Sequence, residues 1–318
     1  MPRFAGAGSF SGVRSAITIG NFDGVHRGHR ALVESIVGWK RGHAEPDSVR
    51  TVVMTFEPHP VEVLRPGTLV PRLTPVAEKQ RLLYGLGVDE VRVVPFTAAF
   101  SKTSARDFFD HVLLQNLKGG FIAVGGNFFF GHNREGSPGR IVDWAQERGF
   151  EAKIIPGVES DGDLISSSRI RRLIEAGEMV PAARLLGRDY SITGEVVHGD
   201  KRGRQLGFPT ANLVPAVAQI GAPCLPARGV YLSSATIEGK TYPSITNVGV
   251  KPTVSNSGQV TVETHLLLTP TPPDLYGKQL TVEFRDRLRA EMKFQGLAEL
   301  VSQIQQDIET ARARLGLR

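Results

Sequence analysis

Strand-like and helix-like segments alternate through the first half of this chain, and this alternation constrains the fold more than any other feature. Apolar strand candidates lie at residues 16–19, 51–56, 88–94, 121–124 and 152–155. Helical candidates separate them at residues 30–39, 74–86, 103–117 and 141–148. Because the strands are separated by helices, the pattern predicts a parallel sheet with helices on both of its faces.

The pattern changes after about Leu186, where strand candidates follow one another without intervening helices. They lie at residues 190–197, 230–237, 242–248, 260–268 and 279–284. Gly239-Lys240 predicts a tight hairpin between the second and the third of them. Such closely spaced strands indicate a barrel or a sandwich, and residues 297–315 then show helical periodicity. We therefore expect two domains, residues 1–186 and residues 187–318, the second being a barrel with one terminal helix.

Charge and cysteine content narrow the class of protein. The formal net charge is +6, with +3 in residues 1–186 and +3 in residues 187–318, so no basic arm marks a nucleic-acid binder. The single cysteine, Cys224, excludes an internal disulfide and a cysteine-cluster zinc site. No apolar run approaches the ~20 residues of a membrane helix, and the N-terminus lacks the apolar core of a signal peptide. We expect a cytoplasmic protein that binds small anionic ligands rather than nucleic acid or a membrane.

The densest motif of the first half lies between a strand and a helix, where parallel sheets bind their ligands. It reads Gly20-Asn21-Phe22-Asp23-Gly24-Val25-His26-Arg27-Gly28-His29. Its glycines let backbone N–H groups approach a phosphate, and the two histidines can donate hydrogen bonds to a phosphorus centre under attack. The candidate nucleotide-binding residues are Gly20, Phe22, Asp23, His26, Gly28 and His29. The competing interpretation is a glycine-rich turn with two surface histidines.

A second anion site is indicated where residues 165–171 begin a helix with the letters Ile-Ser-Ser-Ser-Arg-Ile-Arg. The helix N-terminus, the hydroxyls of Ser167 and Ser168 and the guanidinium of Arg171 together suit phosphate groups. The alternative is an ordinary serine N-cap followed by solvated arginines.

The second half carries a glycine-rich and basic segment, Gly199-Asp200-Lys201-Arg202-Gly203-Arg204-Gln205-Leu206-Gly207-Phe208-Pro209-Thr210-Ala211-Asn212. Gly203 and Arg204 suit a flap that covers phosphates. Thr210 and Asn212 lie two apart on an extended segment, so their side chains share a face and offer neutral oxygens to a hard cation such as Mg²⁺. The alternative is a loop followed by a strand with two solvated polar side chains.

Glu263 is the candidate general base of the second half. It lies in the apolar strand segment Val262-Glu263-Thr264-His265. A carboxylate in such a setting can accept a proton from a hydroxyl nucleophile. The alternative is a glutamate that is paired with a nearby arginine or lysine for structural reasons. No Walker phosphate-binding loop is present, because Ser234 occupies the first glycine position before Gly239-Lys240-Thr241.

Taken together, these motifs resemble those of the bacterial bifunctional riboflavin kinases/FAD synthetases. Four segments are similar to the FAD synthetase module. They are residues 20–29, called the nucleotide loop below, residues 165–171, called the serine–arginine segment below, Thr55-Phe56-Glu57-Pro58-His59-Pro60, and Gly125-Gly126-Asn127-Phe128-Phe129-Phe130-Gly131. Asn127 stands where many relatives carry Asp. The second half resembles riboflavin kinases. The resemblance implies an α/β protein, with an N-terminal Rossmann-like nucleotidylyltransferase domain and a C-terminal β-barrel riboflavin kinase domain with a terminal helix.

The resemblance also implies the reactions and the residue roles. Riboflavin is phosphorylated by ATP to FMN, and the FMN phosphate then attacks the α-phosphorus of ATP to give FAD and pyrophosphate, with Mg²⁺ as the cofactor. His26 and His29 stabilise the transferring phosphate, Ser167, Ser168 and Arg171 hold the triphosphate, and Glu263 is the kinase base. The implied flavin contacts are Phe56, Pro58, Asn127 and Arg289.

Two competing functions stay open at this point. The first is an adenylyltransferase or cytidylyltransferase that acts on another phosphate or nucleotide. The second is a regulatory flavin- or RNA-binding protein on a degenerate enzyme scaffold. The kinase-like second half argues against the first, and the intact His26, His29, Asn212 and Glu263 argue against the second. Nothing in the sequence indicates the oligomeric state.

Overall fold

A computed structural model of the chain describes residues 14–199, 203, 206–215, 221–250, 260–267 and 275–317. The contacts between residues divide the chain into two compact units, and each unit is described by itself. The first unit comprises Met1–Val70 and Val76–Ile165, and the second comprises Pro71–Pro75 and Ser166–Arg318. The expected domain border after residue 186 therefore falls within the second unit.

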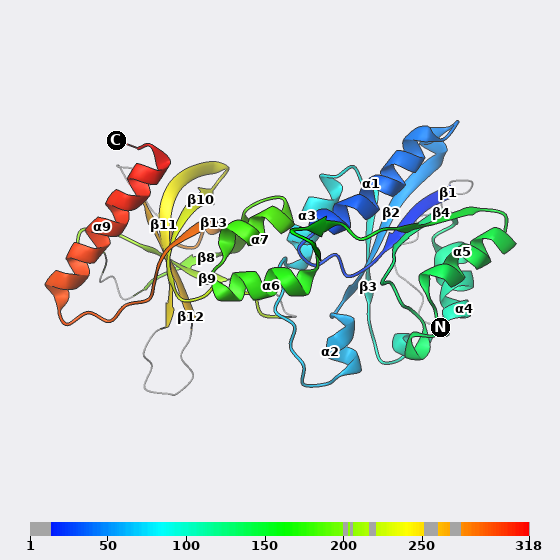
Figure 1. The fold of residues 1–318 in the computed structure, drawn as a ribbon, viewed down its shortest axis with the longest axis horizontal. Coiled ribbons are helices and arrows are strands. Elements are labelled where there is room, and N and C mark those ends of the chain that lie inside the picture. The colour runs from blue at the N-terminus through cyan, green and yellow to red at the C-terminus, as the bar shows by residue number, and fades with distance from the viewer. Residues whose placement is uncertain are drawn as a thin grey trace. The chain divides into compact units, whose positions relative to one another are not determined.

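The first unit is built on a five-stranded parallel sheet in the order β3-β2-β1-β4-β5 (Figure 1). Its strands are β1 (Arg14–Ile19), β2 (Val49–Glu57), β3 (Glu90–Pro95), β4 (Gly119–Gly125) and β5 (Glu151–Ile155). The strand order reverses between β1 and β4, so the loops after these strands meet at the point where such sheets bind nucleotides. This architecture confirms the predicted Rossmann-like half.

Helices cover both faces of this sheet, as the alternation predicts. On one face, Ala16, Val53 and Phe121 pack against α1 (Arg27–Gly42) and α3 (Val76–Tyr84). On the other face, Ile17 and Met54 pack against α4 (Ala105–Asp107), η3 (Phe108–Asn116) and α5 (Pro138–Glu147). The remaining elements of this unit are α2 (Pro60–Leu64), the 3₁₀ turns η1 (Pro46–Ser48), η2 (Phe100–Lys102) and η4 (His132–Arg134), and the two-stranded β6 (Glu159–Ser160) and β7 (Asp163–Leu164).

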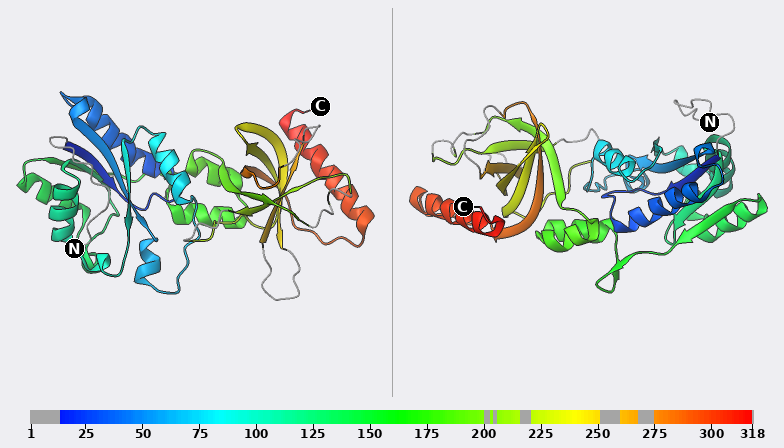
Figure 2. Two further views of the ribbon diagram at one scale, coloured as in Figure 1. Left: turned by 180° about the vertical axis from the view of Figure 1, so that it is seen from behind. Right: turned by 90° about the horizontal axis from the view of Figure 1, so that it is seen from above.

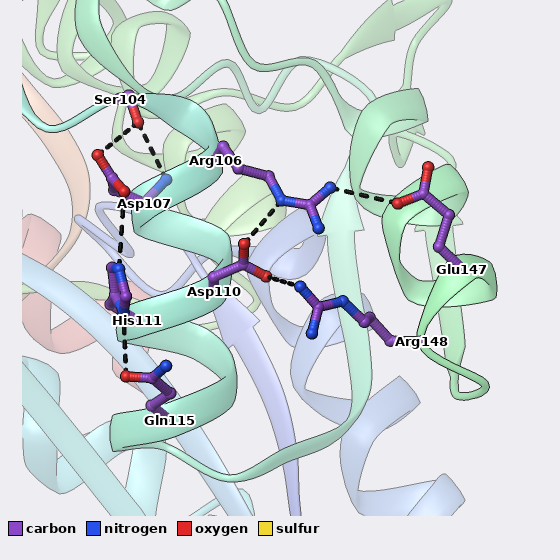
Figure 3. A network of polar contacts seen from close by, with 8 residues as sticks. All are labelled: Ser104, Arg106, Asp107, Asp110, His111, Gln115, Glu147 and Arg148. Atoms are coloured by element: carbon purple, nitrogen blue, oxygen red, sulfur yellow. Dashed lines mark hydrogen bonds and ion pairs between the residues drawn. The ribbon is translucent and has the colours of Figure 1, made fainter.

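The predicted helix over residues 103–117 is divided into one α-helical turn, α4, and the π-helical η3. Charged side chains tie this segment to α5 (Figure 3). Arg106 Nε lies 2.7 Å from Asp110 Oδ2, and Arg148 Nη2 lies 2.9 Å from Asp110 Oδ1. Arg106 also reaches Glu147 at 3.2 Å. These pairs are largely solvent-exposed, so the apolar contacts beneath them contribute more to stability.

The second unit contains a closed antiparallel barrel (Figure 2). Its six strands are paired in the order β10-β11-β12-β9-β8-β13. Its strands are β8 (Tyr190–Val197), β9 (Ala211–Pro215), β10 (Gly229–Ile237), β11 (Lys240–Val250), β12 (Val260–Leu266) and β13 (Gln279–Ala290). Ile237 pairs with Lys240, so the hairpin between β10 and β11 turns at Glu238 and Gly239. Both of these residues adopt positive φ. The turn is thus one position earlier than the predicted Gly239-Lys240 pair, and a barrel is confirmed.

Helices lie before and after the strands of the second unit's barrel in the part of the chain that the structure describes. α6 (Ser167–Ala176) and α7 (Met179–Leu186) precede the barrel, and α7 packs against β8 and β13. The terminal helix α9 (Leu297–Leu315) confirms its predicted range. Ile308 and Ala311 of α9 pack on Val230, Leu232 and Ile245, which therefore lie on the outer face of the barrel. In the described part of the chain, no helix is long and apolar enough to cross a membrane.

A short segment from early in the chain also belongs to the second unit. The Arg72 N–H donates to Ala222 O at 2.8 Å, and the Cys224 N–H donates to Arg72 O at 2.8 Å. The Arg171 guanidinium donates to Pro71 O at 2.7 Å. The five residues Pro71–Pro75 are therefore held like a strand by residues far away in the sequence.

Candidate active sites

The nucleotide loop follows β1, and His26 caps the helix that comes after it. The Nδ1 atom of His26 accepts a hydrogen bond from the His29 N–H at 3.3 Å. The rings of His26 and His29 are stacked with their centroids 3.6 Å apart, and the Phe22 ring lies 5.0 Å from that of His29. The structure therefore brings the two predicted histidines together at the positive end of a helix, where an anion is stabilised.

Backbone geometry explains the residue types of this loop. A Cβ atom at Gly28 would lie 3.2 Å from the His26 ring, so a larger residue would press on the capping imidazole. At the other end of the loop, a Cβ at Gly20 would lie 3.3 Å from the Phe22 ring. Phe22 and Val25 both adopt positive φ, 49° and 41°, which is rare for a β-branched residue such as Val25. The loop is thus held in an unusual conformation that points to a functional requirement.

The His29 imidazole is held neutral. Burial lowers its pKa well below the usual value, and the neighbouring His26 and the Lys79 ammonium lower it further. Its Nδ1 atom is buried and has no hydrogen-bond partner among the described residues. A neutral imidazole carries one N–H, and this ring is therefore able to donate a hydrogen bond to an incoming oxygen.

Polar contacts join the ends of β1 and β2. Thr55 Oγ1 donates to Asn21 O at 2.9 Å, and Asn21 Nδ2 lies 3.2 Å from His59 Nε2. His59 in turn caps α2 by accepting from the Val61 N–H. The sequence shows the motif that contains Thr55 and His59, but it does not show that both side chains contact Asn21 of the nucleotide loop.

The predicted flavin residues of the first unit occupy the carboxyl edge of the sheet. Phe56 ends up in the core, 8% exposed, with its ring 5.7 Å from that of Phe96. Pro58 follows the end of β2 and is partly buried. Asn127 is exposed in the turn after β4, and a Cβ added at Gly125 would lie 3.3 Å from its Oδ1. Because β1, β2 and β4 are adjacent and parallel, these residues lie at the same edge of the sheet as the nucleotide loop.

The serine–arginine segment begins α6, but its cap is one residue earlier than the predicted site serines. Ser166 accepts from the Arg169 N–H at 3.2 Å, so Ser167 and Ser168 occupy the first helical turn. The Arg171 guanidinium donates to the backbone of Pro71. These residues belong to the second compact unit, whereas His26 and His29 belong to the first.

Three polar side chains line up across the barrel. Glu263 of β12 pairs with Asn212 of β9 on one side and with Asn247 of β11 on the other. Asn247 also pairs with Val230, which faces α9. Since directly opposed residues share a face of a sheet, the row lies on the outside of the barrel. Asn247 was not predicted as a site residue.

Two glycines of the predicted phosphate flap, Gly199 and Gly203, lie within the described residues. A Cβ at Gly199 would lie 2.2 Å from Asn212 Nδ2, so glycine there leaves room for one predicted metal ligand. A Cβ at Gly203 would lie 2.5 Å from the Phe208 carbonyl oxygen and 3.3 Å from Thr210 Oγ1, so the backbone of Phe208 is the main reason for glycine at this position. Arg204 lies outside the described residues. Thr210, Asn212 and Glu263 offer only oxygen donors, which suits Mg²⁺, an ion that takes few protein ligands beside phosphates and water. Across the described ranges, no three His, Cys, Asp or Glu side chains form a metal-ligand group.

Arg289, a predicted flavin contact, is engaged by the terminal helix. Its Nε and Nη2 atoms donate to the Asp307 carboxylate at 2.8–3.0 Å, and Gln303 also donates to Asp307 at 3.0 Å. The Phe294 ring lies 5.8 Å from the Arg289 guanidinium. In this structure Arg289 therefore anchors α9 to β13.

Each half of the chain matches a family model of known proteins. Residues 11–169 match the family model described as FAD synthetase, and residues 186–315 match the one described as riboflavin kinase. A relative from Pseudomonas fluorescens named "Bifunctional riboflavin kinase/FMN adenylyltransferase" is 39% identical over 93% of this chain and 91% of its own length. A relative of the same name from Escherichia coli is 39% identical over 95% of this chain and 93% of its own.

A solved structure supports the fold over most of the chain. It is described as "Crystal Structure of Macrolide-efflux Protein from Streptococcus pneumoniae", has a TM-score of 0.83 and 31% identity, and covers 94% of both chains. The efflux name is that protein's own and does not carry over, because the two family models and the curated relatives agree on flavin enzymes. The chain belongs to the family of bifunctional riboflavin kinase/FMN adenylyltransferases, enzymes of flavin cofactor biosynthesis.

Proposed function

We propose that this enzyme phosphorylates riboflavin at the barrel and adenylylates FMN at the nucleotide loop, each reaction with its own ATP. The observation that carries the proposal is the stacked pair His26 and His29 at the N-terminus of α1, together with the separate row that contains Glu263 on the barrel. The functional border is placed after residue 186, with adenylyl transfer in residues 1–186 and phosphorylation in residues 187–318.

For adenylyl transfer, an oxygen of the FMN phosphate bonds to the α-phosphorus of ATP, and the bond from that phosphorus to the β-phosphate oxygen breaks. Pyrophosphate leaves with the bonding electrons. His26 and His29 stabilise the charge that develops on the α-phosphate, since preorganised donors act most strongly in a site that excludes water. The backbone of Gly20, Phe22, Asp23 and Gly28 receives the phosphates. Ser167, Ser168 and Arg171 hold the triphosphate.

For phosphorylation, the terminal ribityl hydroxyl of riboflavin attacks the γ-phosphorus of ATP and ADP leaves. Glu263 accepts the hydroxyl proton and orients the oxygen. Gly203 and Arg204 cover the phosphates. Thr210 and Asn212 would hold Mg²⁺, which neutralises charge on the ATP phosphates when it is bound. Asn212 stands directly opposite Glu263, so the metal site and the base adjoin on neighbouring strands.

Flavin contacts and cellular setting complete the proposal. Phe56, Pro58 and Asn127 bind the flavin of FMN beside the nucleotide loop, and Arg289 contributes to flavin binding at the barrel. The partners are riboflavin, FMN and ATP, with no nucleic acid and no membrane, and the enzyme works in the cytoplasm. The even distribution of the +6 charge supports small anionic substrates.

A reciprocal pair of variants tests the assignment. We expect His29→Ala to lose FAD formation from FMN by about 10²–10³-fold and to form FMN from riboflavin normally. We expect Glu263→Gln to lose FMN formation by about 10²–10⁴-fold, with riboflavin binding and FAD formation from supplied FMN retained. Chromatographic separation of riboflavin, FMN and FAD measures both reactions. Equal loss of both activities in either folded variant would contradict separate sites.

Asn212→Ala tests the metal site. We expect the kinase to need much more Mg²⁺ because one of two neutral oxygen ligands is lost. A titration of the kinase rate against Mg²⁺ decides this, with FAD formation from supplied FMN as the internal control. An unchanged Mg²⁺ requirement at the normal rate would show that Asn212 is not a ligand.

A further inference from the structure

A lysine that the sequence analysis did not single out is buried next to the nucleotide loop. Lys79 is 3% exposed, although lysine is among the residues least often buried. It belongs to α3 and shares a face with Leu83, one turn later, which is fully buried against the sheet. An ammonium on the core-facing side of a helix costs free energy of desolvation, so this position calls for a reason beyond packing.

The surroundings of Lys79 connect it to the loop. Its Nζ lies 3.5 Å from Thr55 Oγ1 at the end of β2. Thr55 Oγ1 in turn donates to the carbonyl oxygen of Asn21, the second residue of the nucleotide loop, at 2.9 Å. The ammonium therefore stands behind the loop that receives phosphates, one hydroxyl away from its backbone.

The charge of Lys79 also acts on the histidine pair. The groups that lower the pKa of His29 are burial, His26 of the loop and Lys79 of α3, in that order. The other titratable or charged groups of the loop, of α1, and of α2 with its cap are not among them; they are Asp23, Arg27, Arg30, Glu34, Lys40, Arg41, His59 and Glu62. A fixed positive charge from α3 thus adds to the effect of His26.

We propose that Lys79 is a positioning residue of the adenylyl-transfer site, whose buried ammonium supplies a positive charge behind the nucleotide loop that carries His29. The proposal rests on the proposed role of His29 in adenylyl transfer. The ammonium repels a proton on His29 and so keeps the ring a neutral donor to the transferring phosphate.

The test uses the full-length enzyme with Lys79→Met, which keeps the length and apolar stem of the side chain and removes the charge. We expect kcat for FAD formation from FMN to fall by about tenfold or more, less than the loss of a direct donor. The pH at which His29 titrates, followed by NMR of ¹³C-labelled histidine and assigned with His29→Gln, should move upward. The acid limb of the kcat profile should move in the same direction.

Controls separate charge from packing. Lys79→Arg keeps the charge and should recover the His29 titration and most of the rate. Lys102→Met removes an exposed lysine of the same unit and should change neither. FMN formation from riboflavin should stay normal in all three variants. If Lys79→Met does not fold, as judged by circular dichroism, Lys79→Gln takes its place.

Each outcome bears on the proposal. An unchanged kcat for FAD formation in the folded variant overturns it, whatever the titration shows. A reduced kcat with an unchanged His29 titration also overturns it, because Lys79 would then act on the substrate without His29. Failure of the proposed function itself is seen elsewhere, as full adenylylation activity in His29→Ala.

Discussion

The smallest fragment that folds as a riboflavin kinase should begin near residue 166 rather than at residue 187. The sequence places the domain border after residue 186, but α7 packs against β8 and β13 within the second unit. Removing residues 166–186 would uncover the barrel surface under α7. We compare the fragments 166–318 and 187–318.

The size of the effect follows from burial. Met179, Leu185 and Leu186 are at most 1% exposed, and full burial of each such side chain contributes about 1.5–3 kcal/mol. Their loss therefore amounts to about 5–9 kcal/mol, against a typical domain stability of about 5–15 kcal/mol. Both fragments also lack Pro71–Pro75 and therefore lose at least its two backbone hydrogen bonds with Ala222 and Cys224, or about 1–3 kcal/mol, in each. The fragment 187–318 should be largely unfolded at 25 °C, whereas 166–318 should fold with reduced stability.

Urea unfolding followed by far-ultraviolet circular dichroism measures this difference, because both tryptophans, Trp39 and Trp144, lie outside the two fragments. Formation of FMN from riboflavin and ATP gives a second readout. If 187–318 unfolds with a free energy within about 1 kcal/mol of that of 166–318 and is equally active, α7 does not stabilise the barrel and the reasoning fails.

Three other predictions follow from the described contacts. Gly199→Ala places a Cβ 2.2 Å from Asn212 Nδ2. It should displace the Asn212 amide and lower the kinase rate by about 10²-fold. Normal kinetics would show that the backbone at residue 199 moves instead of the amide. Asp307→Ala leaves the half-buried Arg289 guanidinium without its carboxylate and should lower the free energy of unfolding in urea by about 3 kcal/mol. The double variant Arg289→Met/Asp307→Leu should lower it less, and equal losses in the two variants would count against the ion pair. The pKa of His29 is lowered in the folded protein, so near pH 6.5 the unfolded chain binds a proton that the folded chain does not bind. The free energy of unfolding should therefore decrease as pH falls below about 6.5, and His29→Gln should weaken this dependence. An identical pH profile of stability in the wild type and the variant would contradict the reasoning.

Periodicity was sufficient for the main elements of the fold. The strand over residues 190–197 and the helix over residues 297–315 have the predicted bounds. The structure extends β13 to Ala290, because pairing with β10 continues through the charged residues that follow Phe284. The short α2 was missed since Pro60 reads as a helix breaker, although proline suits the first helical position. The division of residues 103–117 into α and π turns depends on packing that no local pattern shows.

The site was visible as motifs but not as an arrangement. Asn212, Asn247 and Glu263 lie in separate segments, and only the strand register places them in one row. Histidine is not a common helix cap, so the capping role of His26 left no sequence signal. Lys79 reads as a solvated residue of an amphipathic helix, and only the tertiary fold shows that it is buried.

The strand-like docking of Pro71–Pro75 affects how the chain folds during synthesis. Arg72 leaves the ribosome about 150 residues before its partners Ala222 and Cys224, so at about 5–20 residues per second its two backbone hydrogen bonds wait about 8–30 s to form. For that interval the second unit lacks one of its segments, while the residues on either side of Pro71–Pro75 are already able to join the first unit. A pause in translation before residue 222 would prolong the period in which this apolar and basic segment is open to chaperones and proteases.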